Sequence, residues 1–211
     1  MINIENRFNV VYPESSNATY TSLLNYSDDL NKPFQRWYRY KEGFSVELVQ
    51  QLINEYSKNK KGVILDPFSG SGTTLVAAND MGYSGVGFEV NPFSYFLARC
   101  KIENYDKEIT QQFKEKYEGI LQEAVSADRP KLSISSKVFD DEVEKYFMNV
   151  GCLIDEADVS DEKIKNLLKL GWLACIEPLC NYRKAGNGLK IKKYVKPRIV
   201  TTDDAKVMLL E

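Results

Sequence analysis

The sequence contains no histidine, which excludes several classes of site at once. Zinc sites built on imidazole, Ser-His-Asp and Cys-His nucleophile systems and imidazole general bases all need the missing residue. The four cysteines show no CxxC spacing, so neither a zinc knuckle nor a redox motif is indicated. We therefore predict no metal site and reduced thiols, and any chemistry must use carboxylates, lysine, tyrosine, backbone groups or a cofactor.

Long apolar runs are also missing. No 18 consecutive residues are apolar, and the first residues are too polar for a signal peptide. We expect a soluble, cytoplasmic protein with no membrane contact.

The small net charge of -2 hides two segments of opposite sign. Residues 140–162 carry nine acids against one lysine, and we expect the acids of 140–144 and 155–162 to be solvated. Residues 181–198 carry seven bases and no acid. Such a run is either a solvated face or a contact for a phosphate backbone. The candidate nucleic-acid contacts in it are Arg183, Lys184, Lys190, Lys192 and Lys193.

Alternating strand and helix patterns occupy the first half of the chain. Ser45 is a plausible N-cap for a helix, and Asn91 with Pro92 opens another. Between them lie a short strand, a helix that ends at Gly82 and a second strand. The expected elements are helix 45–57, strand 63–65, helix 75–81, strand 85–89 and helix 91–102. This order predicts an α/β fold with a parallel sheet and a right-handed crossover.

The second half of the chain has a helical pattern. Apolar stripes recur through residues 106–180, and the only further strand candidates, 132–138 and 198–201, are weak. We expect an incomplete sheet with a helical insertion. The predicted parts are an N-terminal arm with a covering segment (1–44), a βαβα core (45–105), a helical region (106–180) and a basic C-terminal segment (181–211).

A glycine-containing loop lies between the first strand and the helix after it. It reads Asp66-Pro-Phe-Ser-Gly-Ser-Gly-Thr-Thr74 and stands where α/β sheets place ligands, at the carboxyl ends of their strands. A phosphate-binding P-loop needs a Gly-Lys-Ser/Thr ending, which is missing. A dinucleotide motif is weak here because Leu75 replaces its third glycine.

Two acids define the ligand that this loop would take. Asp66 ends the first strand, where a carboxylate suits a ligand with an ammonium group better than a pyrophosphate. Glu89 ends the second strand, where an acid can accept hydrogen bonds from both ribose hydroxyls. A ligand with a ribose, an amine and no phosphate is S-adenosylmethionine. Val90, Pro92 and Phe93 would flank its adenine.

These segments resemble the amino-methylating DNA methyltransferases of restriction-modification systems, which act on adenine N6 or cytosine N4. Residues 65–74 look like the family's cofactor motif, and residues 87–92 look like its ribose-binding motif. Residues 33–45 resemble an element that closes over the methionine end, and 183–190 resemble a stretch before the catalytic motif. The resemblance implies a Rossmann-like methyltransferase core. The implied cofactor-binding residues are Asp66, Pro67, Phe68, Gly70, Gly72, Thr73, Thr74, Glu89, Val90, Pro92, Tyr40 and Phe44.

The catalytic motif of that family is not present. It consists of Asp, Asn or Ser followed by Pro-Pro and an aromatic, and none of the seven prolines here are adjacent. We therefore assign no catalytic residue. We expect one portion or subunit of a split DNA methyltransferase that needs a second polypeptide, with a truncated, inactive product as the other possibility.

Two further alternatives remain open at this point. The chain can be a degenerate, non-catalytic module with a methyltransferase fold, or a methyltransferase that acts on RNA or a small molecule. The aromatic segment 36–44 either contacts the cofactor or simply covers one side of the sheet.

Overall fold

The computed structural model describes residues 31–40, 43–57, 62–127, 138–185 and 188–191, and residues 203, 205, 207 and 209. The chain divides into two compact units. Among the described residues, the first unit contains 31–36 and 40–98, and the second contains 37–39 and everything from Arg99 onward. We describe each unit by itself.

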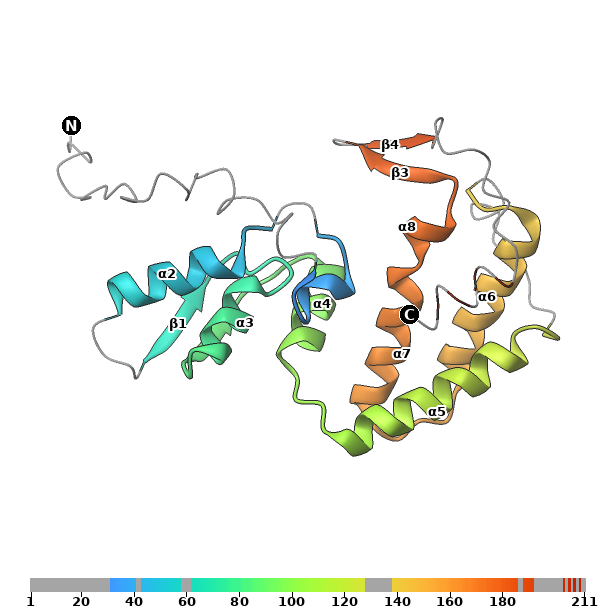
Figure 1. The fold of residues 1–211 in the computed structure, drawn as a ribbon, viewed down its shortest axis with the longest axis horizontal. Helices are drawn as coiled ribbons and strands as arrows, with labels where there is room; N and C mark the ends of the chain where they lie inside the picture. Colours follow the sequence, from blue (N-terminus) through green and yellow to red (C-terminus); the bar gives the residue numbers. More distant parts are fainter. Residues whose placement is uncertain are drawn as a thin grey trace. The chain divides into compact units, whose positions relative to one another are not determined.

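The first unit contains strands and helices of the expected α/β segment, and it ends at Ala98 rather than at residue 105 (Figure 1). Its elements are η3 (Gln35–Trp37, shared with the second unit), α2 (Val46–Tyr56), β1 (Val63–Asp66), α3 (Thr73–Asp80), β2 (Ser84–Gly87) and the first part of α4 (Pro92–Ile102). Ser45 caps α2 as predicted, because its hydroxyl accepts a hydrogen bond from the Leu48 amide at 3.1 Å. Asn91 caps α4 in the same way through the amides of Phe93 and Ser94.

Strands β1 and β2 pair in parallel, with Leu65 opposite Val86. One face of this sheet lies against α3, where a Cβ on Gly85 would come within 2.9 Å of Leu75. Val49 and Ile53 of α2 pack with Ala77 and Ala78 of α3 in one apolar cluster. The prediction of an α/β fold with a parallel sheet is therefore confirmed.

The other face of the sheet is bare among the described residues. Its four large apolar side chains are 44 to 64 % exposed: Val63, Leu65, Val86 and Phe88. A parallel sheet normally has both faces covered. The described part of the core is thus half of a layered structure.

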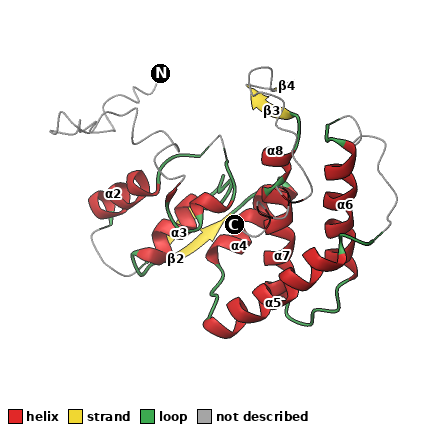
Figure 2. Cartoon of the chain, turned by 45° about the vertical axis from the view of Figure 1, so that its right-hand side comes forward, coloured by secondary structure: helices red, strands yellow, loops and turns green. Residues whose placement is uncertain are grey.

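The second unit is mainly helical (Figure 2), as expected from the apolar stripes in residues 106–180. It contains the end of α4, α5 (Lys107–Glu123), α6 (Asp141–Glu156), α7 (Glu162–Ala174) and α8 (Ile176–Leu179). Phe147 of α6 stacks between Phe139 and Trp172, with ring centroids 5.3 and 5.1 Å away. Glu144 corrects one expectation, since it is fully buried rather than solvated.

A β-hairpin that the sequence did not predict follows α8. Strands β3 (Tyr182–Ala185) and β4 (Gly188–Ile191) pair antiparallel and form a sheet of their own. The weak strand candidates lie outside the described residues except for Val138, which is not in a strand.

Membrane spans, metal ligands and cysteine pairing can be examined in the described residues. No described helix is long and apolar enough to cross a membrane. The described residues contain no group of three or more potential metal ligands. All four cysteines are thiols, and burial raises the pKa of Cys100 to about 12 and that of Cys175 to about 11.

Candidate cofactor site

The loop after β1 is held against the end of β2 by backbone hydrogen bonds. The Phe88 amide donates to the Asp66 carbonyl at 3.0 Å, and the Ser69 amide donates to the Phe88 carbonyl at the same distance. The Ser69 hydroxyl donates to that carbonyl as well, at 3.2 Å. The carboxyl ends of both strands and the loop therefore form one surface, on which Asp66 and Glu89 both stand.

Two glycines give this loop its shape. Gly70 and Gly72 have φ angles of +50° and +85°, a region that L side chains rarely adopt. A Cβ on Gly72 would also lie 2.9 Å from Ala98 of α4, and one on Gly70 would lie 3.5 Å from the Tyr40 ring. The loop thus passes close to α4 on one side and close to Tyr40 on the other.

Asp66 has one satisfied and one unsatisfied carboxylate oxygen. Oδ1 accepts a hydrogen bond from the Phe68 amide at 3.0 Å. Oδ2 is buried and has no hydrogen-bond partner among the described residues. A buried acceptor without a donor costs about 1–3 kcal/mol, so such groups in folded proteins call for an explanation. A cationic group on a ligand would satisfy it.

Glu89 follows β2 and is half-buried. Its Oε1 accepts a hydrogen bond from the Asn91 amide at 2.7 Å, which fixes the carboxylate beside the start of α4. Val90, the next residue, is 97 % exposed, and Phe68 of the glycine loop is 86 % exposed, so both side chains are accessible to a ligand. Pro67 and Pro92 are exposed too.

Three aromatic residues of the segment 36–44 contact different parts of the protein. The Tyr40 hydroxyl accepts a hydrogen bond from Ser94 of α4 at 3.3 Å and its ring lies beside Gly70, so Tyr40 is at the glycine loop. Phe44 packs on the apolar cluster between α2 and α3, and Trp37 packs edge to face on Tyr105 in the second unit. Of the two cofactor candidates in this segment, Tyr40 lies at the loop and Phe44 does not.

The remaining predicted residues fall into two groups. Thr73 and Thr74 are buried in the first turn of α3. Arg183 and Lys190 are exposed on the β3–β4 hairpin, whereas Lys192, Lys193 and the side chain of Lys184 lie outside the described residues. Ser94 was not predicted as a site residue, although its position in the first turn of α4 follows from the Asn91 cap.

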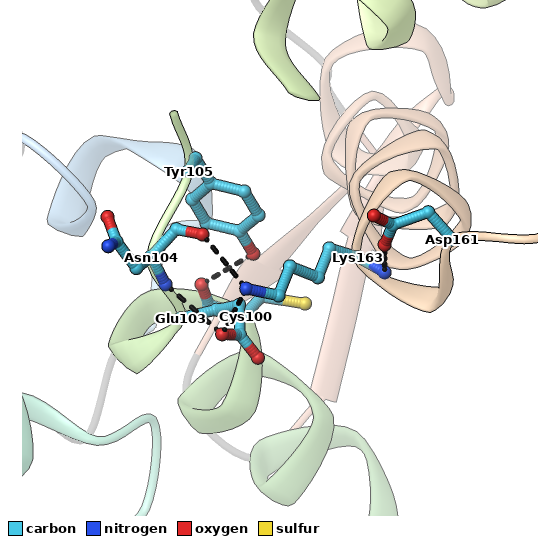
Figure 3. Close-up of polar contacts among 6 residues, drawn as sticks. All are labelled: Cys100, Glu103, Asn104, Tyr105, Asp161 and Lys163. Carbon is cyan, nitrogen blue, oxygen red and sulfur yellow. Dashed lines mark hydrogen bonds and ion pairs between the residues drawn. The ribbon is translucent and has the colours of Figure 1, made fainter. Parts of the chain in front are cut away.

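A second polar cluster lies within the helical unit (Figure 3). A cavity of about 190 Å³ there is lined by Arg99, Cys100, Glu103, Tyr105, Asp161, Glu162, Lys163 and Asn166. Lys163 Nζ lies 2.9 Å from the Glu103 carboxylate and donates to the Asn104 carbonyl, and the Tyr105 hydroxyl donates to the Cys100 carbonyl. These contacts tie α7 to the loop before α5.

The comparisons with known proteins point to DNA methylases. Residues 7–99 match the DNA methylase family of N6/N4 methyltransferases. The type II methyltransferase M.BsoBI of Geobacillus stearothermophilus is 32 % identical over 188 residues, which cover 88 % of this chain and 36 % of that protein. The type II methyltransferase M.AvaI of Nostoc is 41 % identical over 92 residues, which cover 44 % of this chain and 18 % of that protein. The type II methyltransferase M.MjaII of Methanocaldococcus jannaschii is 39 % identical over 67 residues, which cover 32 % of this chain and 12 % of that protein.

The chain therefore spans little more than a third of the length of M.BsoBI and less of the other two. No solved structure gives a significant match. The family match lies over the loop, both strands of the parallel sheet and Glu89. Through this segment the chain is similar to the N6/N4 DNA methylases and to the type II methyltransferases named above, in line with the resemblance of its motifs.

Proposed function

We propose that this chain is the S-adenosylmethionine-binding portion of a site-specific DNA amino-methyltransferase with a Rossmann-like core. The observation that carries the proposal is the buried, unpartnered Oδ2 of Asp66 at the carboxyl end of β1. In an α/β sheet, ligands bind at this edge. A carboxylate oxygen without a donor fits an ammonium group there.

The loop residues fit the rest of such a cofactor. Asp66 would hold the methionine ammonium, the backbone of Gly70–Gly72 its carboxylate end, and Glu89 the ribose hydroxyls. Tyr40 would cover the methionine end, and Val90 with Pro92 would flank the adenine. When bound, the cofactor supplies an electrophilic methyl group. This chain's residues would orient the cofactor for direct transfer to the amino nitrogen of a flipped base.

The groups that hold the target base would come from outside this sequence, on a continuing or a separate polypeptide. The sequence contains no Pro-Pro-aromatic motif. The bare sheet face of Val63, Leu65, Val86 and Phe88 supports the same view, because completing the sheet and covering this face would require further strands and helices. The substrate would be DNA, and the enzyme would work in the cytoplasm.

Calorimetry with S-adenosylmethionine tests the cofactor assignment. Wild type should bind, Asp66→Asn should bind about tenfold or more weakly because it loses a charge-assisted contact, and Glu89→Gln should also weaken binding. Lys107→Gln in α5 is the control and should bind like wild type. The absence of binding by wild type would reject the assignment and favour a non-catalytic module.

Complementation tests the second part of the proposal. The chain alone should transfer no methyl group to duplex DNA, and activity should appear when a polypeptide with a Pro-Pro-aromatic motif is co-expressed with it. Robust methylation by the isolated chain would contradict the need for a second part while leaving cofactor binding intact.

A further inference from the structure

The β3–β4 hairpin places two cations directly opposite each other. Arg183 on β3 is in register with Lys190 on β4, and both residues are exposed. Like charges at directly opposed positions of an antiparallel pair destabilise it. A two-stranded hairpin is itself only marginally stable, so this pair works against the element that carries it.

No anionic side chain offsets this pair among the described residues. Neither Arg183 nor Lys190 takes part in a described ion pair, whereas Arg99, Lys163 and Lys169 of the same unit each pair with an acid. No acidic residue lies nearby in the sequence either, since residues 181–198 contain neither Asp nor Glu. An anion from outside the chain would offset the repulsion.

The base of the hairpin is fastened to the helical unit. The Asn181 amide donates to the Val138 carbonyl at 2.7 Å, and its side chain donates to Asp140 at 3.1 Å. Figures 1 and 2 both show the two strands beyond the end of α8, on the side away from α5. The strands therefore form a ribbon that is held at one end and pairs with no third described strand.

We propose that this hairpin is a basic β-ribbon that lies in a groove of duplex DNA, with Arg183 and Lys190 on its phosphates. The inference rests on the proposed function and adds the element that holds the substrate. The major groove admits a two-stranded β-ribbon, and cations on the ribbon can reach the phosphates along it. Phosphate groups bound by Arg183 and Lys190 would offset the repulsion between these two cations.

Anisotropy of a labelled duplex, measured over a range of KCl concentrations, tests the proposal. The double variant Arg183→Gln/Lys190→Gln should bind at least about tenfold more weakly at low salt, and its slope of log affinity against log salt should fall by about two. The matched control is Lys107→Gln/Lys114→Gln on α5, which removes the same charge from exposed positions and should leave the slope unchanged.

Two further measurements keep the result interpretable. The hairpin variant should melt no lower than wild type, since it relieves a repulsion, and it should bind S-adenosylmethionine as wild type does. The single variant Lys190→Gln, with an expected slope change of about one, replaces the double variant if that one melts early. Equal slope losses in the hairpin variant and the control would overturn the proposal, and so would wild-type affinity in the hairpin variant. Neither result would affect the cofactor assignment.

Discussion

Gly72 combines two constraints that other glycines carry separately. Its φ of +85° is unfavourable for a side chain, and a Cβ would lie 2.9 Å from Ala98. Gly82 has a similar φ of +77° with nothing within 4 Å, and Gly62 has neither constraint. These three positions separate backbone strain from steric overlap.

Alanine substitutions at the three positions should therefore form a series. We expect Gly62→Ala to change the free energy of unfolding by at most about 0.5 kcal/mol, Gly82→Ala to lower it by about 1–2 kcal/mol, and Gly72→Ala to lower it by about 1–3 kcal/mol more. Urea denaturation measures all three. Equal losses for Gly72→Ala and Gly82→Ala would mean that α4 moves aside without cost.

Glu103 predicts a pH dependence in the helical unit. The hydrogen bond from Lys163 holds the pKa of its carboxyl below the ordinary value of 4.5. The resulting stabilisation is present above pH 4.5 and is lost as the pH falls through the lowered pKa. It should be small, up to about 1 kcal/mol, because both side chains are about one third exposed.

Melting curves between pH 6 and pH 3 measure this contribution. The stability advantage of wild type over Glu103→Gln should shrink as the solution becomes acidic. Glu108→Gln, at the start of α5, serves as a reference for a nearby acid without such an ion pair among the described residues. A constant difference between wild type and Glu103→Gln at every pH would contradict the ion-pair explanation.

At the scale of elements, the contact between α6 and α7 depends on one small residue. A Cβ on Gly151 would overlap the indole of Trp172, whose Nε1 donates to the Phe147 carbonyl at 2.9 Å. The indole cannot move away without breaking this hydrogen bond and the stacking on Phe147.

Gly151→Ala should therefore destabilise the protein by about 1–3 kcal/mol, although alanine is the better helix former. Gly119→Ala in α5 is the matched control, because nothing lies within 4 Å of its Cβ position, and it should stabilise slightly. Denaturant midpoints compare the two. If Gly151→Ala were more stable than wild type, the Trp172 side chain would have an alternative conformation without loss of stability.

Elements with local signals were predictable from the sequence, and elements without them were not. Ser45, Asn91 and Gly82 mark ends of helices because caps and left-handed turns have strong residue preferences. The β3–β4 hairpin was missed because its strands, Tyr182–Ala185 and Gly188–Ile191, are interrupted by basic residues and lack the unbroken apolar run that marked β1.

The candidate cofactor loop shows the same limit for single residues. The motif predicted which residues surround the loop, because the end of a strand fixes where Asp66 and Glu89 stand. It could not show that Phe44 belongs to the core while Tyr40 lies at Gly70, since that depends on packing between elements distant in sequence.

At the scale of the whole molecule, the bare sheet face is where we expect the rest of the enzyme to dock. Leu65→Thr/Val86→Thr should keep both cofactor binding and stability in the isolated chain, because these side chains are exposed and threonine suits a strand. The double variant should no longer associate with the complementing polypeptide in size-exclusion chromatography.

A matched change elsewhere controls for lost apolar surface. Leu52 and Val125 are 46 and 53 % exposed, and Leu52→Thr/Val125→Thr should associate as wild type does. If the sheet variant loses stability on its own, a segment of this same chain already covers the face, and the docking proposal fails.

The buried Oδ2 of Asp66 has no hydrogen-bond partner among the described residues, so this aspartate should lower the stability of the chain on its own. Taking away that charge, as in Asp66→Asn, should raise the melting temperature of the ligand-free chain even as it impairs recognition. Selection for sturdiness alone would discard this aspartate. An aspartate that lowers stability at this position fits the proposed role of binding a positively charged ligand group.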